Sequence, residues 1–207
     1  MKPLLNNAET IKWYDSHSKE YAEKIGNKSQ LDEIEQFSKH LPSGAKVLDL
    51  GCAAGRDSHI FAEKAFDVIG IDFSQKLIDI AIKSFPSIKF VRANMLDLPF
   101  EDGIFDGVWA SACLVHLDDK EQVKNALLEI DRVLTTGGFL YVSMQNRDNV
   151  ESGWVTDEHS KEGRFFQFFN LSSTREIIEE IGYKVIDSFS RVSSRKGISW
   201  SVVFARK

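Results

Sequence analysis

Two short apolar runs near the middle of the chain end on residues that suit ligand binding. The run at 47–50 is followed by Gly51 and Gly55, and the run at 68–71 ends on Asp72. Glycines let a ligand approach the backbone, and a helix N-terminus presents free N–H donors. A carboxylate at the end of the next strand can accept hydrogen bonds from ribose hydroxyls. Together these residues predict a pocket for a nucleoside-bearing cofactor.

The spacing of the two glycines argues against two common nucleotide-binding loops. A dinucleotide-binding loop has a third glycine in G-x-G-x-x-G, and a P-loop closes with Gly-Lys-Ser/Thr. Neither pattern surrounds Gly51 and Gly55. Asp57, at the start of the expected helix, would repel a pyrophosphate, whereas a zwitterionic amino-acid group could place its carboxylate on Arg56. Arg56 could instead form a salt bridge on the surface.

Candidate catalytic residues lie after the expected strand at 105–110. Ser111 follows this strand at the edge where ligands of parallel sheets bind, and His116 lies just beyond it. Because histidine titrates near neutrality, His116 is a candidate general base, with Tyr14 and Tyr21 as alternatives. The competing interpretation of His116 is a packed or capping side chain.

An aromatic-rich stretch at 164–169 provides candidate substrate contacts. It follows a long polar segment, 145–163, that contains Trp154. Loops of this length in compact domains are often lids or binding loops, so we interpret 145–163 as a candidate lid. Arg164, Phe166 and Trp154 are then candidates for the wall of a substrate pocket. The alternative is that 164–169 is a core strand.

Composition excludes several classes of protein. The chain has 207 residues, enough for one sizeable domain, and its net charge of −5 argues against bulk nucleic-acid binding. The N-terminus lacks the apolar core of a signal peptide, and no run reaches transmembrane length. Cys52 and Cys113 lack metal-ligand spacing, which favours a reducing cytoplasm and a metal-independent protein. We expect a small-molecule partner, and no sequence feature specifies an oligomeric state.

Strands and helices alternate through the centre of the chain. We expect strands at 46–50, 67–71, 88–92, 105–110 and 139–144, and helices at 57–64, 74–84 and 120–134. Nearly all-apolar strands that alternate with helices are typical of a parallel sheet covered on both faces.

The two ends of the chain complete the predicted architecture. Helical periodicity at 8–24 and 29–40 predicts an N-terminal cap, and a helix at 172–182 precedes a hairpin of strands at 183–192 and 198–205. The predicted fold is a doubly wound α/β fold with a mostly parallel seven-stranded sheet, helices on both faces and a C-terminal antiparallel hairpin. We expect a single domain over 1–207, divided into a helical cap (1–44), a cofactor-binding core (45–144), a lid and pocket wall (145–170) and a C-terminal helix with hairpin (171–207).

In combination, the motifs resemble the class I, Rossmann-like S-adenosylmethionine-dependent methyltransferases, the small-molecule type in particular. Trp13-Tyr14-Asp15 through Tyr21 is similar to the N-terminal helix that covers the cofactor in this family. The other matching segments, in order, are Val47-Leu48-Asp49-Leu50-Gly51-Cys52 with Gly55, Gly70-Ile71-Asp72-Phe73-Ser74, Asp97-Leu98-Pro99-Phe100, Phe105-Asp106-Gly107-Val108-Trp109 and Leu134-Thr135-Thr136-Gly137-Gly138.

The resemblance implies roles for residues at the cofactor site. Gly51 and Gly55 would border the methionyl part, Asp72 would accept from the ribose hydroxyls, and Phe73 would lie beside the adenine. Asn94 stands where the family usually has an acidic residue that accepts from the adenine amino group, and its amide oxygen can accept the same bond. The remaining residues assigned to this site are Asp49, Cys52, Arg56, Met95 and Ser111.

Two assignments at this site stay open. Asp49 could contact the cofactor through water or bond backbone amides near the turn. Of Tyr14 and Tyr21, one could cap the sulfonium while the other fills the core.

The implied reaction is in-line methyl transfer from S-adenosylmethionine to a small-molecule acceptor, which leaves S-adenosylhomocysteine. The Asn/Asp-Pro-Pro-aromatic motif of related DNA amino-methyltransferases does not follow the strand at 105–110, which argues against base amines as acceptors. Two alternatives remain open, a nucleotide-dependent oxidoreductase and a non-catalytic S-adenosylmethionine-binding scaffold protein.

Overall fold

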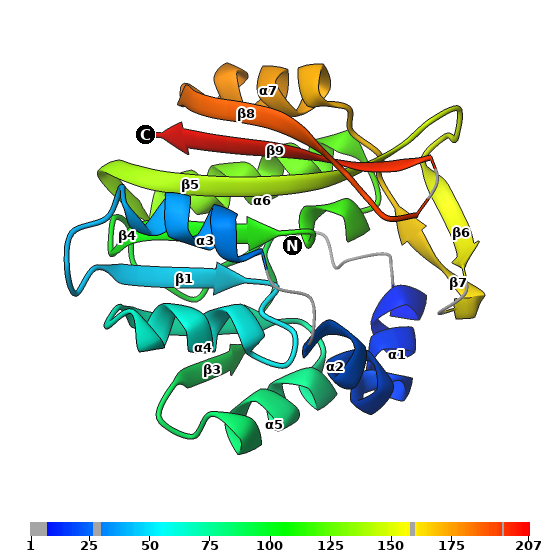
Figure 1. The fold of residues 1–207 in the computed structure, drawn as a ribbon, viewed down its shortest axis with the longest axis horizontal. Helices are drawn as coiled ribbons and strands as arrows, with labels where there is room; N and C mark the ends of the chain where they lie inside the picture. The colour runs from blue at the N-terminus through cyan, green and yellow to red at the C-terminus, as the bar shows by residue number, and fades with distance from the viewer. Residues whose placement is uncertain (1–7, 27–29, 158–159, 196) are drawn as a thin grey trace.

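A seven-stranded sheet with helices on both faces forms the centre of the molecule (Figure 1). The computed structural model describes residues 8–26, 30–157, 160–195 and 197–207. The strands of this sheet are β1 (Lys46–Leu50), β2 (Asp67–Asp72), β3 (Lys89–Arg92), β4 (Phe105–Ser111), β5 (Leu134–Arg147), β8 (Lys184–Val192) and β9 (Ile198–Arg206). The helices are α1 (Ala8–Ser16), α2 (Ser18–Gly26), α3 (Leu31–Ser38), α4 (Arg56–Glu63), α5 (Gln75–Ser84), the 3-10 turn η1 (Leu114–His116), α6 (Lys120–Val133) and α7 (Leu171–Glu180).

The order of the strands places a crevice at the ends of β1 and β4. The sheet runs β3-β2-β1-β4-β5-β9-β8, with β1 to β5 parallel and β9 antiparallel to both β5 and β8. From β1, the strands that follow in sequence are added first on one side (β2, β3) and then on the other (β4, β5). Ligands of such sheets bind outside the carboxyl ends of the strands at this switch point. The predicted mostly parallel sheet with a C-terminal antiparallel pair is confirmed.

Side chains of the central strands alternate between two cores. Leu48 and Leu50 of β1 lie in the core that includes α6, whereas Val47 lies in the other core, against α3 and α4. In that second core Trp109 stacks on Tyr141, with ring centroids 3.6 Å apart. Because both faces of β1 are buried, its sequence reads as a nearly continuous apolar run.

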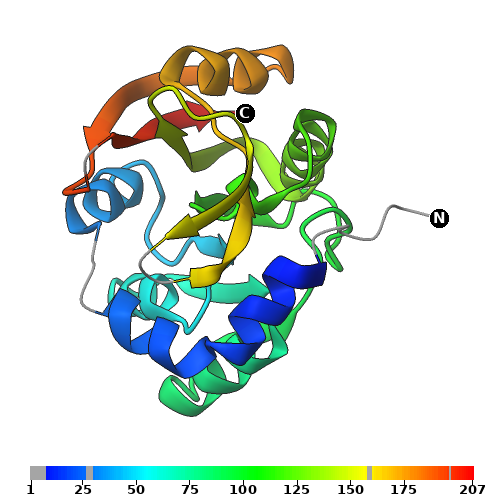
Figure 2. The same cartoon turned by 90° about the vertical axis from the view of Figure 1, so that its right-hand side faces the viewer.

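The prediction of one helical segment at 8–24 is wrong in one respect, because this part of the chain forms two helices, α1 and α2. The bend lies at His17, whose backbone N–H and ring Nδ1 both lie within hydrogen-bond distance of the Trp13 carbonyl, at 2.9 and 3.0 Å. Figure 2 shows α1 and α2, in blue, meeting at an angle below the yellow hairpin of β6 (Gly153–Asp157) and β7 (Ser160–Phe166). The bend lets α1 contact both this hairpin and α5.

The segment expected to be an irregular loop at 145–163 is largely β structure, which corrects that expectation. β5 continues to Arg147 because β9 pairs with it along this length, with Gln145 opposite Trp200. A separate hairpin follows, formed by β6 (Gly153–Asp157) and β7 (Ser160–Phe166). Backbone pairing satisfies the N–H and C=O groups here without any apolar periodicity in the sequence. A role of this hairpin as a lid stays a prediction.

Candidate active site

A cleft is lined by the carboxyl ends of β1, β2 and β4 together with residues of α1, α2 and β7. It consists of two adjoining compartments that share several wall residues, namely Tyr14, Tyr21, Gly51, Ala53, Ser111, Ala112 and His116. The first compartment has mostly apolar walls, which include Ile11, Leu50, Ile71, Leu77, Met95 and Leu117. Asp72 and Phe73 also line it. The second compartment is richer in polar side chains.

The turn after β1 is held to β2 and to the segment after β4. The N–H groups of Gly51 and Cys52 both donate to the Ile71 carbonyl, at 2.8 and 2.9 Å. Gly51 has φ +73°, and a Cβ atom there would overlap the Cβ of Cys113. Only glycine satisfies both conditions, so this turn can lie directly against the start of η1.

Gly55 is required by the packing of α4, and its expected role at the cofactor stays a prediction. It begins α4 with φ +84°, and an added Cβ would lie 2.7 Å from Cζ of Phe90. Among the described residues that line the two compartments, Gly51 is present and Gly55 is not. In this structure Gly55 therefore allows α4 to pack against Phe90.

The Asp72 carboxylate ties the two ligand-binding turns together. One oxygen accepts from the N–H of Ala53 at 3.0 Å and the other from the N–H of Ser74 at 2.8 Å. Burial raises the pKa of Asp72, and these backbone N–H groups oppose that shift. Each carboxylate oxygen has a further lone pair, so Asp72 can also accept from a ligand in the first compartment.

Asn94 and Met95 are placed differently from each other. Met95 lines the first compartment, together with Ala93. The Asn94 amide oxygen accepts from the N–H of Leu96 at 3.0 Å, and Asn94 is not among the described residues that line either compartment. The structure therefore brings Met95 to the cleft while the Asn94 oxygen closes a local turn.

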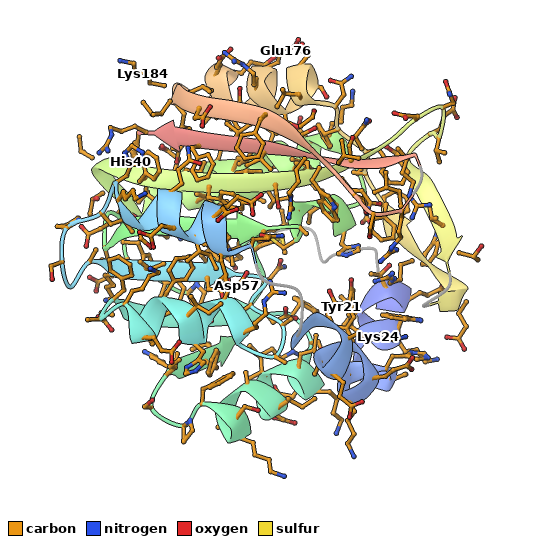
Figure 3. All side chains as sticks on the ribbon, in the orientation of Figure 1. Tyr21, Lys24, His40, Asp57, Glu176 and Lys184 are labelled. Atoms are coloured by element: carbon orange, nitrogen blue, oxygen red, sulfur yellow. The ribbon has the colours of Figure 1, made fainter. Side chains whose placement is uncertain are left out.

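A buried acidic network lies beneath the turn after β1. Asp49 accepts from the Ser58 hydroxyl at 2.5 Å, and Asp57 accepts from Arg56 Nε at 2.7 Å and Trp109 Nε1 at 3.0 Å. Figure 3 shows Asp57 beside the carboxyl end of β1. Burial, reinforced by the charge of Asp57, raises the pKa of Asp49 to about 7. Asp49 and Arg56 both line the second compartment, where Arg56 is ion-paired with Asp57.

Three segments distant in sequence meet in one chain of hydrogen bonds beside the cleft. Arg164 Nη1 of β7 donates to the Tyr14 hydroxyl at 3.0 Å, and that oxygen lies 2.8 Å from His116 Nε2. The other ring nitrogen, Nδ1, lies 2.9 Å from the Phe165 carbonyl. Because a carbonyl only accepts, Nδ1 carries the proton and Nε2 accepts from Tyr14.

Burial determines the protonation of Tyr14 and His116 in this hydrogen-bonded series. It lowers the pKa of His116 to about 4, with the bond to the Phe165 carbonyl opposing this shift. Burial also raises the pKa of Tyr14 well above its usual value. At neutral pH the imidazole is therefore neutral, and its unprotonated Nε2 accepts the hydrogen bond from the Tyr14 hydroxyl.

The depressed pKa of His116 predicts a pH-dependent loss of stability. Between about pH 6.5 and pH 4, the unfolded state binds a proton at His116 that the folded state does not. The free energy of unfolding therefore decreases as the pH is lowered through this range. The loss should total about 3 kcal/mol and level off below the folded pKa. Urea denaturation of wild type and His116→Gln across this range measures the difference. Equal pH dependence in both proteins would contradict the assignment of a buried neutral His116.

Two of the three candidate substrate residues reach the cleft. Arg164 is buried, with its guanidinium 4.4 Å from the Trp13 ring centroid, and Phe166 lies 4.7 Å from the His116 ring centroid. Both line the second compartment. Trp154 is 51% exposed on β6, makes an edge contact with Phe165 and is absent from the described lining of both compartments.

Hydrogen bonds that the sequence did not predict, two of them to the unassigned residues Thr10 and Gln30, hold α1 and the cleft in place. The Asp15 carboxylate accepts from the Ser74 hydroxyl at 2.6 Å, and Thr10 Oγ1 accepts from the Phe165 N–H at 3.1 Å. Gln30 accepts from the Ser111 hydroxyl at 2.9 Å. Only Ser74 carried a local signal, as the expected start of a helix. The partners of these bonds lie 59 to 155 residues apart in sequence.

The two thiols, Cys52 and Cys113, are unpaired and buried at the cleft. Burial raises the pKa of both thiols above the usual value. Within the described residues, no group of three or more His, Cys, Asp or Glu side chains could hold a metal ion. None of the helices in that part of the chain is long and apolar enough to cross a membrane.

Comparisons with known proteins agree with this geometry. Residues 47–138 match the family described as methyltransferase domain. An uncharacterized protein of Methanocaldococcus jannaschii is 32% identical over 86% of this chain and 78% of its own length. The O-methyltransferase rstn1 of Aspergillus nomiae is 30% identical over 75% of this chain and 71% of its own length.

A solved structure has the same fold over almost the whole chain. It is the 1,6-didemethyltoxoflavin-N1-methyltransferase of Burkholderia thailandensis, with 1,6-didemethyltoxoflavin and S-adenosylhomocysteine bound. The TM-score is 0.78 at 21% identity, and the match covers 99% of this chain and 92% of the other. At this identity the similarity establishes the fold alone.

Proposed function

Because this chain belongs to the class I S-adenosylmethionine-dependent methyltransferases, we propose that it methylates an oxygen atom of a small molecule held in the second compartment. The observation that carries the proposal is the shared wall of the two compartments, where His116 and Tyr14 lie between them. The relatives named as O-methyltransferases support oxygen as the acceptor atom. Membership of this family argues against the oxidoreductase alternative.

The first compartment fits the cofactor. Its apolar walls, including Phe73 and Met95, suit an adenine ring, and the oxygens of Asp72 at the end of β2 suit ribose hydroxyls. Gly51 and Ala53 line both compartments, so the methionyl part of the cofactor could pass along them from the first compartment toward the second. Asp49 near the end of β1, Cys52 in the following turn and Arg56 at the start of α4 border the second compartment, next to the expected position of the amino-acid end.

The protein's own chemistry centres on one proton. When bound, the cofactor would supply an electrophilic methyl group on a positively charged sulfur, with S-adenosylhomocysteine as the leaving group. A hydroxyl acceptor must lose its proton, and Tyr14 can take that proton as it passes its own to His116 Nε2. Arg164 donates to the Tyr14 oxygen, so negative charge that develops there is stabilised. Orientation of the acceptor by the second compartment would supply much of the remaining rate enhancement.

Two further aspects are part of the proposal. The two unpaired, buried thiols support a reducing location such as the cytoplasm. The net charge of −5 supports a small molecule rather than a nucleic acid as the partner.

Binding and transfer can be tested separately. Calorimetry should show binding of S-adenosylhomocysteine and none of NAD, and incubation with methyl-labelled S-adenosylmethionine and metabolite extracts should label a small molecule. Binding of NAD alone would overturn the proposal. Binding of S-adenosylhomocysteine with no labelled product from any extract would favour a non-catalytic binding protein.

We expect Asp72→Asn to weaken binding of S-adenosylhomocysteine about tenfold, because a neutral acceptor makes weaker hydrogen bonds than a carboxylate. The amide NH₂ of the variant would also face one of the two backbone N–H groups that now donate to the Asp72 carboxylate, and two donors cannot bond to each other. Calorimetry measures the change. Asp67→Asn, at the exposed opposite end of β2, is the matched control and should bind like wild type. Equal affinity of all three proteins would remove Asp72 from the cofactor site.

A further inference from the structure

The second compartment extends from the shared wall to the C-terminal hairpin. Beyond His116 and Tyr14, its lining includes Gln145 of β5, Arg164 and Phe166 of β7, and residues of β8, β9 and the turn that joins them. The members from this hairpin are Arg191, Val192, Ser193, Ser194, Arg195, Ile198 and Trp200. The sequence did not assign any of these hairpin residues to a site.

The described lining of this compartment carries an excess of positive charge. It contains five Lys or Arg side chains, Lys24, Arg56, Arg164, Arg191 and Arg195, and three acidic ones, Glu20, Asp49 and Asp57. Counting these eight side chains alone, with the carboxylates ionised, the net charge is +2, although the whole chain carries −5. Burial disfavours the charged form of the Asp49 carboxyl and raises its pKa, which acts in the same direction. Glu33, which lies outside the lining, forms an ion pair with Arg191 at 3.1 Å and leaves a smaller positive excess. The compartment therefore has the opposite sign from the protein around it.

The acidic lining residues come from α2, β1 and α4, whereas three of the arginines come from β7, β8 and the β8–β9 turn. Asp49 and Asp57 are buried beneath the turn after β1, and Glu20 pairs with Lys24 at 2.7 Å. Arg164 lies over Trp13, and Arg191 lies 5.9 Å from the Trp200 ring centroid and forms an ion pair with the buried Glu33 at 3.1 Å. An arginine stacked on an aromatic face can still donate hydrogen bonds in its own plane.

We propose that the methyl acceptor carries an oxyanion group, a carboxylate or a phosphate, which binds the arginines of β7 and the β8–β9 turn. This inference rests on the proposed function, because it concerns the acceptor of that same site. Guanidinium groups match the planar geometry of carboxylates and the oxygens of phosphates. The same charge disfavours cationic amines as acceptors, since like charges repel in a partly desolvated site.

Arg195 provides the cleanest variant for a test. It lies in the β8–β9 turn and is in none of the apolar cores, so Arg195→Gln removes charge without removing core packing. Arg195→Lys keeps the charge and should restore most of the affinity for an anion. Arg175→Gln on α7 is the matched control, because Arg175 pairs with Glu179 and does not line the compartment.

The test uses protein saturated with S-adenosylhomocysteine and three probes of similar shape, benzoate, phenyl phosphate and uncharged benzamide. NMR titrations of labelled protein should show saturable binding of at least one anion, about tenfold tighter than benzamide. Arg195→Gln should weaken the anion several-fold, whereas Arg175→Gln should bind it like wild type. The tighter of the two anions identifies carboxylate or phosphate as the preferred group.

The proposal is overturned if benzamide binds as tightly as both anions, or if Arg195→Gln and Arg175→Gln bind the anions like wild type. A protein that does not bind S-adenosylhomocysteine contradicts the proposed function instead. The two failures are therefore distinguishable within one set of measurements.

Discussion

Replacing Gly51 with alanine is expected to lower the free energy of unfolding by about 3–5 kcal/mol. Two costs combine at this position. The backbone has φ +73°, which is unfavourable for alanine, and the new Cβ would overlap Cβ of Cys113. The turn is also held by two hydrogen bonds to the Ile71 carbonyl, so it cannot shift without breaking them. Urea denaturation monitored by circular dichroism measures the loss.

Gly44→Ala is a matched control for this experiment. Gly44 has φ +74°, almost the same as Gly51, but an added Cβ there meets no atom within 4 Å. It should therefore show the conformational cost alone, about 1–2 kcal/mol. The difference between the two variants isolates the steric contact with Cys113. Equal destabilisation would mean that the turn relaxes away from η1, and that the close approach is not required.

Substitution of His116 is expected to have the largest effect on turnover. His116→Ala should reduce kcat by about a hundredfold, because the variant lacks Nε2, the atom that would receive the proton of the methyl acceptor through Tyr14. Affinity for S-adenosylhomocysteine should change little, because the base faces the shared wall and is not among the groups that would bind adenosine. Turnover is measured with the acceptor that the labelling screen identifies, and affinity by calorimetry.

A second substitution separates proton transfer from positioning. His116→Gln keeps an oxygen that can accept from Tyr14 but cannot take a proton at neutral pH. If His116 is the base, Gln and Ala should be equally slow. If His116 only positions Tyr14, Gln should retain most of the activity, and the assignment of His116 as the base would be wrong. His59→Ala, on α4 with His59 partly exposed, is the control for loss of a histidine and should retain full activity.

The parallel sheet and the methyl donor could be predicted from local patterns. Apolar runs such as 47–50 and 68–71 report burial on both faces of a strand, so alternation with helices indicates a doubly wound sheet. Gly51 and Asp72 are separated by one helix, so the strand–turn–helix connection alone brings them to the same sheet edge. The role of each glycine needed the structure, because Phe90, which excludes a side chain at Gly55, lies on another strand.

Polar and irregular segments were predicted less well. The segment 145–163 has no apolar periodicity, yet part of it pairs with β9 and part forms the β6–β7 hairpin. Strand pairing depends on a partner that lies elsewhere in the sequence, and exposed or hairpin strands need no apolar face. Trp154 therefore could not be placed from sequence, and the structure turns it to an exposed surface of β6.

The sequence by itself determined the fold class, the family and the cofactor, because these depend on motifs that are local to one strand, turn and helix. Only the tertiary structure decided how the site is completed. Tyr14, His116 and Arg164 form one hydrogen-bonded chain although Tyr14 and Arg164 are 150 residues apart, and Arg195 joins the same compartment from the C-terminal hairpin. Hydrogen bonds and charges at such distances depend on how whole layers pack, and periodicity within a segment carries no information about that packing.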